Sequence, residues 1–242
     1  MSSLSRRNFL KITAVAAAAL AVPAVADVAR RSGQTQLTET RSLMGTLVHL
    51  TIITPDESTG REALEATFGE MERLIAIFDH RRDSSPLAAL NRSGQLASAP
   101  PELKTVLSMA TDYGALTNGA FDVTVKPILD HYQMGKLDIE SARALVDYRQ
   151  VVITDEQIAF SIPGMAVTLD GIAKGYVVDR GAAVLYEHGF ANVIVESGGD
   201  LFARGHSWRT DGWQIGITHP RPERLSGYIA HFSLSDCAIA TS

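Results

Sequence analysis

The chain has 242 residues, of which 45% are hydrophobic and 20% charged, and its formal net charge is −5 at pH 7. Such a length predicts one domain with a sizeable core, or one domain with a subdomain. The acidic balance argues against nucleic acid and anionic membrane surfaces as partners. The single cysteine, Cys237, excludes a disulfide framework within the chain, and its apolar surroundings predict a buried strand residue.

The N-terminus has the pattern of an export signal. The pair Arg6-Arg7 is followed by Phe9-Leu10-Lys11, an uncharged run over 12–26 and the small-x-small sequence Ala24-Val25-Ala26. This pattern predicts a twin-arginine signal peptide over 1–26, cleaved after Ala26, and a periplasmic protein. A plain Sec leader would also export the chain, and an uncleaved leader would tether it to the inner membrane. No other transmembrane span is expected.

Cleavage would remove three positive charges and no acid, which changes the formal charge from −5 to −8. Residues 27–40 are polar without periodicity, so we expect a flexible spacer there and the folded domain over 41–242. Strands and helices are interspersed beyond it, which favours an α+β fold with a mixed, mostly antiparallel sheet over a doubly wound parallel sheet. The first predicted elements are a strand at 47–53, a helix at 61–79, a short helical stretch that ends at Asn91, and helices at 101–117 and at 138–148, the last with Asp138 as N-cap. They are followed by a hairpin at 151–160, a strand at 165–169, a helix opening at 172–175, and strands at 192–196, 201–203, 213–217, 228–234 and 238–240.

Residues 168–205 hold two glycine turns at strand ends. Asp170-Gly171 opens a helix, and Ser197-Gly198-Gly199-Asp200 follows a buried strand. Such turns let backbone N–H groups approach a ligand closely, and a helix N-terminus favours an anion. Lys174 lies in the first helical turn, where a cation opposes the helix dipole. Its position suggests a negative ligand nearby; the alternative is a side chain that points into water.

Four segments in fixed order resemble the ApbE-type FAD:protein FMN transferases, and the resemblance covers residues 44–242. They are Met44-Gly45-Thr46, the sequence SPLAALN at 85–91, GAFDVT at 119–124, and LDGIAKGYVVD at 169–179 with VESGGD at 195–200. Each motif alone is weak, and the four together are specific. The resemblance implies an ApbE or T-fold-like α+β fold. It also implies an enzyme that uses FAD and Mg²⁺ to pass FMN to a Thr or Ser hydroxyl of a target flavoprotein.

The resemblance also implies site residues. Gly171 falls where the family offers an oxygen ligand to magnesium, which here is a backbone carbonyl. Read without the family, Phe121 would be a core residue, Asp122 a helix N-cap and Asp200 a turn residue. The implied cofactor-binding residues are Met44, Gly45, Thr46, Arg81, Asn91, Ala120, Phe121, Asp122, Thr168, Asp170, Lys174, Gly198, Gly199 and Asp200.

Two positions depart from the family pattern. Arg81 stands where many relatives have Tyr or Trp, so it would stack on the flavin by its guanidinium face or lie against a phosphate. Thr168 stands where many have Asp, and the nearby acid is Asp170. The family's catalytic histidine and its remaining magnesium ligands would fall beyond Ser242, so we expect a C-terminally truncated fragment. The seven histidines present are expected to be structural or exposed.

Three functions remain open at this point. The first is a periplasmic flavin transferase, of a type that fits the maturation of a respiratory membrane flavoprotein in nitrous oxide respiration. The second is a non-catalytic FAD-binding or chaperone module. The third is an FAD pyrophosphatase, in which water replaces the acceptor hydroxyl, and Asn91 lies where the family could bias that choice.

Overall fold

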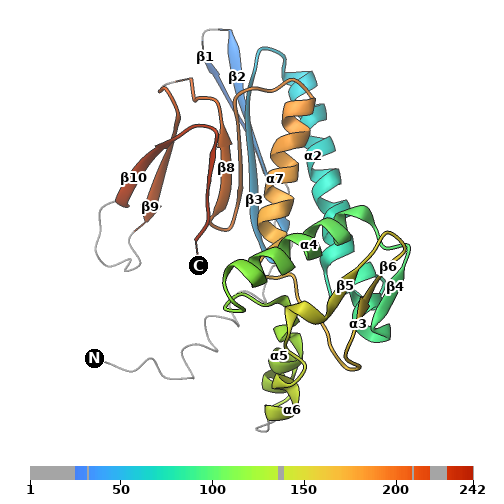
Figure 1. The fold of residues 1–242 in the computed structure, drawn as a ribbon. Helices are drawn as coiled ribbons and strands as arrows, with labels where there is room; N and C mark the ends of the chain where they lie inside the picture. The colour runs from blue at the N-terminus through green and yellow to red at the C-terminus, as the bar shows by residue number, and fades with distance from the viewer. Residues whose placement is uncertain (1–24, 32, 136–138, 209, 219–227, 242) are drawn as a thin grey trace. The chain divides into compact units, whose positions relative to one another are not determined.

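The computed structural model describes residues 25–31, 33–135, 139–208, 210–218 and 228–241 (Figure 1). The predicted leader up to residue 24, Asp138, His219 and Ser242 lie outside these ranges. The described chain forms two compact units, the sheet unit (Met1–Met71 with Val178–Ser242) and the middle unit (Glu72–Val177). No helix of the described ranges is long and apolar enough to cross a membrane.

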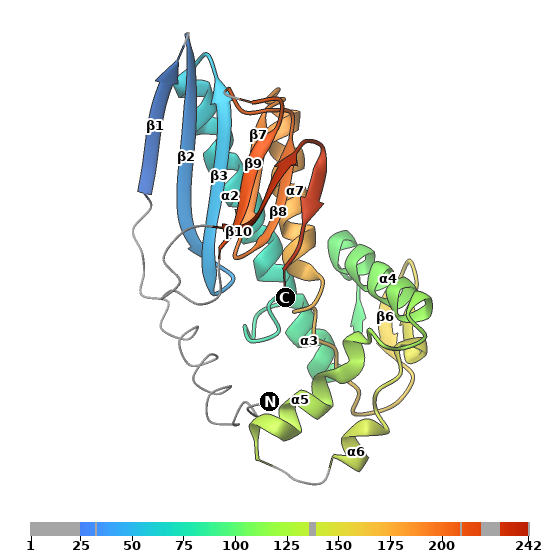
Figure 2. The ribbon, with the colours of Figure 1, turned by 90° about the vertical axis from the view of Figure 1, so that its left-hand side faces the viewer.

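The sheet unit is built on a six-stranded sheet in which every pair of neighbours is antiparallel (Figure 2). The α+β class is therefore confirmed, and the parallel alternative is excluded. In spatial order the strands are β1 (Val25–Arg31), β2 (Gln34–Leu43), β3 (Thr46–Thr54), β7 (Val193–Ser197), β8 (Asp200–Arg204) and β11 (Cys237–Ile239).

Helices cover one face of this sheet and a hairpin covers the other (Figure 2). Helices α2 (Glu57–Phe78) and α7 (Ala173–Glu187) lie over the face that carries Val48, Leu50 and Val195, all fully buried. On the other face, the hairpin of β9 (Trp213–Thr218) and β10 (Tyr228–Leu234) brings Trp213 against a cluster of buried side chains. That cluster comprises Ile53, Leu201 and Ala203.

Helical spacing of apolar residues explains α2. Leu64, Phe68 and Met71 recur every three or four residues and are buried against the sheet, as a one-sided helix requires. Arg41 from β2 places its guanidinium 4.2 Å from the centre of the Phe68 ring. The predicted helix at 61–79 is thus confirmed, with its start four residues earlier at Glu57.

The middle unit combines short helices with a small antiparallel sheet of order β4-β6-β5. Ser85 caps α3 by accepting the Ala88 N–H at 3.0 Å, and Gly94 ends it in the left-handed conformation. The remaining elements are α3 (Pro86–Ser93), β4 (Gln95–Ala97), α4 (Pro101–Leu116), the 3₁₀ helix Val123–Val125, α5 (Lys126–Gln133), α6 (Glu140–Arg143), the 3₁₀ helix Tyr148–Gln150, β5 (Val151–Ile153) and β6 (Gln157–Phe160).

The expectation of a flexible spacer over 27–40 is wrong. Strands β1 and β2 occupy most of this segment and pair with each other and with β3. Leu37 is its buried anchor, 2% exposed, and Thr38 hydrogen-bonds Thr51 of β3 through their hydroxyls, 2.9 Å apart. The segment lacks apolar alternation because threonines supply its β-branched side chains.

The helix predicted at 138–148 is also wrong in length, since α6 ends at Arg143. Tertiary contacts stop it: Asp147 donates its N–H to the Thr124 hydroxyl at 2.8 Å, and its side chain caps the 3₁₀ helix that starts at Tyr148. Cys237 lies in a strand as predicted, but it is only partly buried because β11 is the edge of the sheet.

Residues 165–169 form no strand, although their apolar side chains alternate. Met165, Val167 and Leu169 are buried. Asn91 takes the place of a neighbouring strand, because its side-chain oxygen accepts the Val167 N–H at 2.8 Å and its amide donates to the Val167 carbonyl at 2.9 Å. Thr168 donates its N–H to the Val123 carbonyl at 2.8 Å.

The two glycines of α2 give a matched stability test. A Cβ on Gly60 would lie 2.6 Å from a Leu37 methyl, whereas a Cβ on Gly69 would meet nothing within 4 Å. We expect Gly60→Ala to destabilise the protein by about 1–3 kcal/mol through overpacking. Gly69→Ala should stabilise it by about 0.5–1 kcal/mol through helix propensity. Urea unfolding measures both changes, and equal effects would contradict the packing of α2 on β2.

Asn91→Ala tests the bonding of the 165–169 segment. The substitution removes both partners of Val167, at a cost of about 1–3 kcal/mol. Amide hydrogen exchange should show lost protection at Val167, while Thr168, whose N–H bonds a backbone carbonyl, keeps more of its protection. Undiminished protection at Val167 in the variant would show that another group satisfies this amide.

Candidate functional site

In the sheet unit, two tight turns lie side by side at one end of the sheet. Met44 and Gly45 connect β2 to β3 with φ angles of 53° and 72°, and Gly198 and Gly199 connect β7 to β8 with 54° and 92°. Two central residues with positive φ define the type I′ hairpin turn. Because Val48 pairs with Ser197 across antiparallel β3 and β7, the two turns lie at the same end of the sheet.

Close packing fixes the glycine turn between β7 and β8 at this end of the sheet. A Cβ on Gly198 would lie 2.5 Å from the Thr46 hydroxyl oxygen, and one on Gly199 would lie 2.2 Å from that of Thr241. Thr241 also donates its hydroxyl to the Gly199 carbonyl at 3.2 Å and its N–H to the Asp200 carboxylate at 3.3 Å. The structure thus brings together the implied residues of two motifs and adds Thr241, which we did not anticipate.

A carboxylate braces the second turn from within the sheet. Glu196 accepts the Gly199 N–H at 2.7 Å, so this N–H faces protein and not a ligand. The other oxygen of Glu196 lies 3.7 Å from His49 Nε2, and His49 Nδ1 lies 2.8 Å from the Thr40 hydroxyl. The sequence analysis did not predict this row of polar contacts, although Glu196 directly precedes the SGGD sequence. Ser197 adds a buried hydroxyl that has no hydrogen-bond partner among the described residues.

In the middle unit, a network of contacts joins implied residues from three motifs. Asn91 holds Val167, and Thr168 bonds the residue after Asp122. A Cβ on Gly171 would lie 3.2 Å from the Phe121 ring. The implied residues Asn91, Phe121, Asp122, Thr168, Asp170 and Gly171 are therefore linked through direct or adjacent contacts.

Asp170 forms the most highly charged contact of this network. Arg81 binds it through two parallel hydrogen bonds, Nη1–Oδ1 at 3.2 Å and Nη2–Oδ2 at 2.7 Å, and His80 Nε2 lies 3.6 Å from Oδ2. The His80 imidazole, with the Arg81 guanidinium, holds the pKa of Asp170 well below its usual value, against the desolvation that would raise it. Asp170 is therefore ionised and already paired. His80 was expected to be structural or exposed, and its side chain is 12% exposed.

In the GAFD segment the N-cap predicted for Asp122 without the family is confirmed, whereas Phe121 is only partly buried and does not belong to the core. Asp122 caps the 3₁₀ helix by accepting the Thr124 N–H at 2.8 Å, and its other oxygen accepts the Tyr148 N–H at 3.0 Å. Phe121 is half-buried and stacks edge-on against Tyr113 with ring centres 6.3 Å apart. Ala120 is exposed beside it. The Asp122 carboxylate is thus engaged by the protein itself.

The turn before α7 carries Gly171, and the first turn of the helix carries Lys174. Gly171 is exposed, and Lys174 is half-buried in the first helical turn. Within the described ranges, no three His, Cys, Asp or Glu side chains lie close enough together to bind a metal ion. Asp170, the acid next to Gly171, is held by Arg81 and His80.

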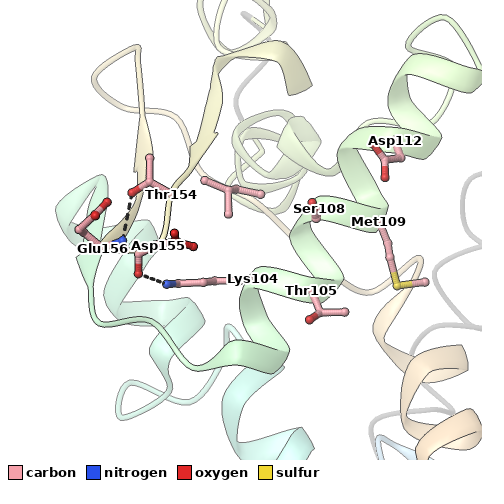
Figure 3. A pocket seen from close by; sticks show the side chains of 9 residues that line it. Lys104, Thr105, Ser108, Met109, Asp112, Thr154, Asp155 and Glu156 are labelled. Atoms are coloured by element: carbon pink, nitrogen blue, oxygen red, sulfur yellow. Dashed lines mark hydrogen bonds between the residues drawn. The ribbon is translucent and has the colours of Figure 1, made fainter.

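A separate open depression lies between α4 and the β5–β6 hairpin (Figure 3). Lys104 of α4 reaches across it and donates to the Asp155 carbonyl. Asp112 and Glu156 also line it, whereas none of the residues implied by the resemblance does.

The paired Asp170 predicts a pH effect on stability. Its pKa is lower in the folded chain, so its contribution is full above the unfolded value of about 3.9 and is lost as the pH falls through the folded value. For a half-exposed pair we expect Asp170→Asn to cost at most about 1 kcal/mol at pH 7. Urea unfolding at pH 7, 4 and 3 should show the difference from wild type shrinking toward acid. A difference that grows on acidification would contradict the pairing.

Comparison with known proteins places this geometry in a family. The sequence model of the ApbE family matches residues 44–242, and that of the twin-arginine translocation pathway signal sequence matches residues 3–23. Among curated relatives, the FAD:protein FMN transferase of Salmonella typhimurium is 24% identical over 82% of this chain and 61% of its own length. That of Vibrio cholerae is 30% identical over 72% of this chain and 56% of its own length. The chain thus spans about three fifths of the curated relatives that it matches.

Solved structures share the fold. The ApbE protein of Thermotoga maritima superposes with a TM-score of 0.74 at 25% identity, over 86% of this chain and 70% of that one. The flavin transferase ApbE of Vibrio cholerae gives 0.72 at 26% identity, over 91% and 72%. The residues implied by the resemblance all fall within the matched 44–242 segment. The chain belongs to the ApbE family.

Proposed function

We propose that this protein is an exported FAD:protein FMN transferase. The observation that carries the proposal is the family match over 44–242, with relatives that bear this activity in their names. The geometry supports it in two places. The sheet unit presents two adjacent type I′ turns with Thr46 and Thr241 packed on their glycines, and the middle unit presents the N-terminal end of α7 with Lys174.

The reaction exchanges one phosphate ester for another. The hydroxyl oxygen of an acceptor Thr or Ser attacks the phosphorus of the FMN half of FAD, and a new P–O bond forms. The P–O bond to the AMP half breaks, AMP leaves with the electron pair, and the hydroxyl proton passes to a base. Such transfers depend mainly on positioning and charge neutralisation. We assign Lys174 of the middle unit to the phosphates. For the sheet unit, taken by itself, we assign the glycine turns to close backbone contact with a ligand.

Mg²⁺ is part of the proposal as a companion of FAD. When bound, a divalent cation neutralises charge on the pyrophosphate. Gly171 is exposed, and a backbone carbonyl is a hard oxygen donor of the kind Mg²⁺ accepts; phosphate oxygens and water complete such sites in proteins. The described side chains do not form a metal site by themselves. The positioning roles above are therefore assigned without the metal.

We also propose a periplasmic location, with an acceptor among respiratory membrane flavoproteins. The twin-arginine match at 3–23 supports export. Retention of the leader as a tether to the inner membrane would bring the protein close to a membrane-bound acceptor. The acidic chain gives no support for nucleic acid as a partner.

Mass spectrometry of an acceptor peptide tests the activity. Protein expressed from its complete reading frame is incubated with FAD, Mg²⁺ and a peptide that holds a candidate acceptor Thr. Covalent FMN on the peptide supports transfer. Free FMN with AMP would show an FAD pyrophosphatase, and unchanged bound FAD would show a binding or chaperone module; either result overturns the proposal.

Lys174→Ala tests the placement of the phosphates. Loss of a charge-assisted contact should weaken FAD binding ten- to a hundredfold, with a smaller effect on thermal stability. The matched control is Lys104→Ala in the depression of α4, which should bind FAD like wild type. Titration calorimetry measures both, and unchanged FAD affinity in folded Lys174→Ala would remove Lys174 from the site.

A further inference from the structure

An ion pair lies directly beside the segment assigned to the phosphates. Arg81 and Asp170 are 89 residues apart in the chain, and their two hydrogen bonds join the turn after α2 to the loop before α7. Both side chains remain more than half exposed, at 63% and 52%. Asp79 also faces this arginine, with Oδ1 3.9 Å from Nη1.

The sequence position of Asp170 creates an electrostatic problem. It immediately precedes Gly171 and lies four residues before Lys174, where the proposed function places a pyrophosphate. Like charges at close range repel, and partial burial reduces the screening by water. An unpaired carboxylate here would oppose the binding of FAD.

The contacts of Asp170 remove this problem. The planar guanidinium of Arg81 covers both carboxylate oxygens, which a lysine could not do with the same geometry. His80 lies against one of the same oxygens, 3.6 Å away. The pair carries no net charge, so Asp170 no longer opposes an anion at the end of α7.

We propose that Arg81 is a positioning residue that acts through Asp170: it neutralises this carboxylate and so allows the loop before α7 to accept the phosphates of FAD. The inference rests on the proposed function and deepens it. It differs from the two roles expected from the sequence, stacking on the flavin or direct contact with a phosphate. In both of those roles Arg81 would act on the ligand itself.

A double-mutant cycle with FAD as the probe separates these roles. Arg81→Met should weaken FAD binding about tenfold, because the Asp170 carboxylate loses its guanidinium partner and keeps only the His80 contact. Asp170→Asn should bind FAD severalfold more tightly than wild type, because an acid is removed and Arg81 is released. The double variant Arg81→Met with Asp170→Asn should return to within about threefold of wild type. Arg81→Lys, which keeps the charge, should also stay within about threefold.

Two comparisons make the cycle specific. Riboflavin lacks phosphates, so its affinity should be the same in wild type and Arg81→Met. Arg73→Met breaks another exposed ion pair of the middle unit, with Glu102, and should leave FAD binding unchanged. Titration calorimetry at low ionic strength measures every variant, and circular dichroism confirms that each is folded.

Several results would overturn the inference. If the double variant is as weak as Arg81→Met, the arginine contacts FAD directly. Equal losses for FAD and riboflavin would show a structural or stacking role. Wild-type affinity in Arg81→Met would also end the inference while leaving the proposed function intact. If the wild-type protein itself does not bind FAD, both the proposed function and this inference are wrong.

Discussion

The register between β3 and β7 determines the architecture of the candidate site in the sheet unit. Val48 pairs with Ser197, so the β2–β3 turn and the β7–β8 turn lie next to each other at one end of the sheet. A shift of one residue would turn every side chain of β7 to the opposite face and bury Glu196 under the helices. The buried alternation of Val193 and Val195 resists that shift. The position of the two turns at this end of the sheet thus depends on the packing of Val193 and Val195 in the core.

The middle unit uses side chains where the sheet unit uses strand pairing. Asn91 bonds both backbone groups of Val167 and leaves the following residues free to turn into α7. That turn exposes Gly171 and places Asp170 against Arg81 and His80. The result is a loop whose backbone is held by the Asn91 amide and whose acidic side chain, Asp170, is held by the Arg81 guanidinium and the His80 imidazole. This arrangement is suited to an anionic ligand.

The sequence predicted the elements whose own periodicity defines them. Helices such as α2 and the glycine turn after β7 were predicted correctly, because apolar spacing and tandem glycines are local signals. The segment at 27–40 was mistaken for a spacer because its pairing with β3 depends on threonines. Residues 165–169 were mistaken for a strand because burial produces the same alternation whether the partner is a strand or Asn91. Likewise, the pairing of Arg81 with Asp170 joins residues far apart in sequence, and only the fold brings them together.

The central claim is that FAD binds with its phosphates at the loop before α7. Backbone amide chemical shifts recorded during an FAD titration with Mg²⁺ test it most directly. The account predicts saturable shifts at Gly171 and Lys174, with little change along the α4 depression at Lys104. Shifts confined to that depression, or saturable binding that leaves the shifts of Gly171 and Lys174 unchanged, would contradict it.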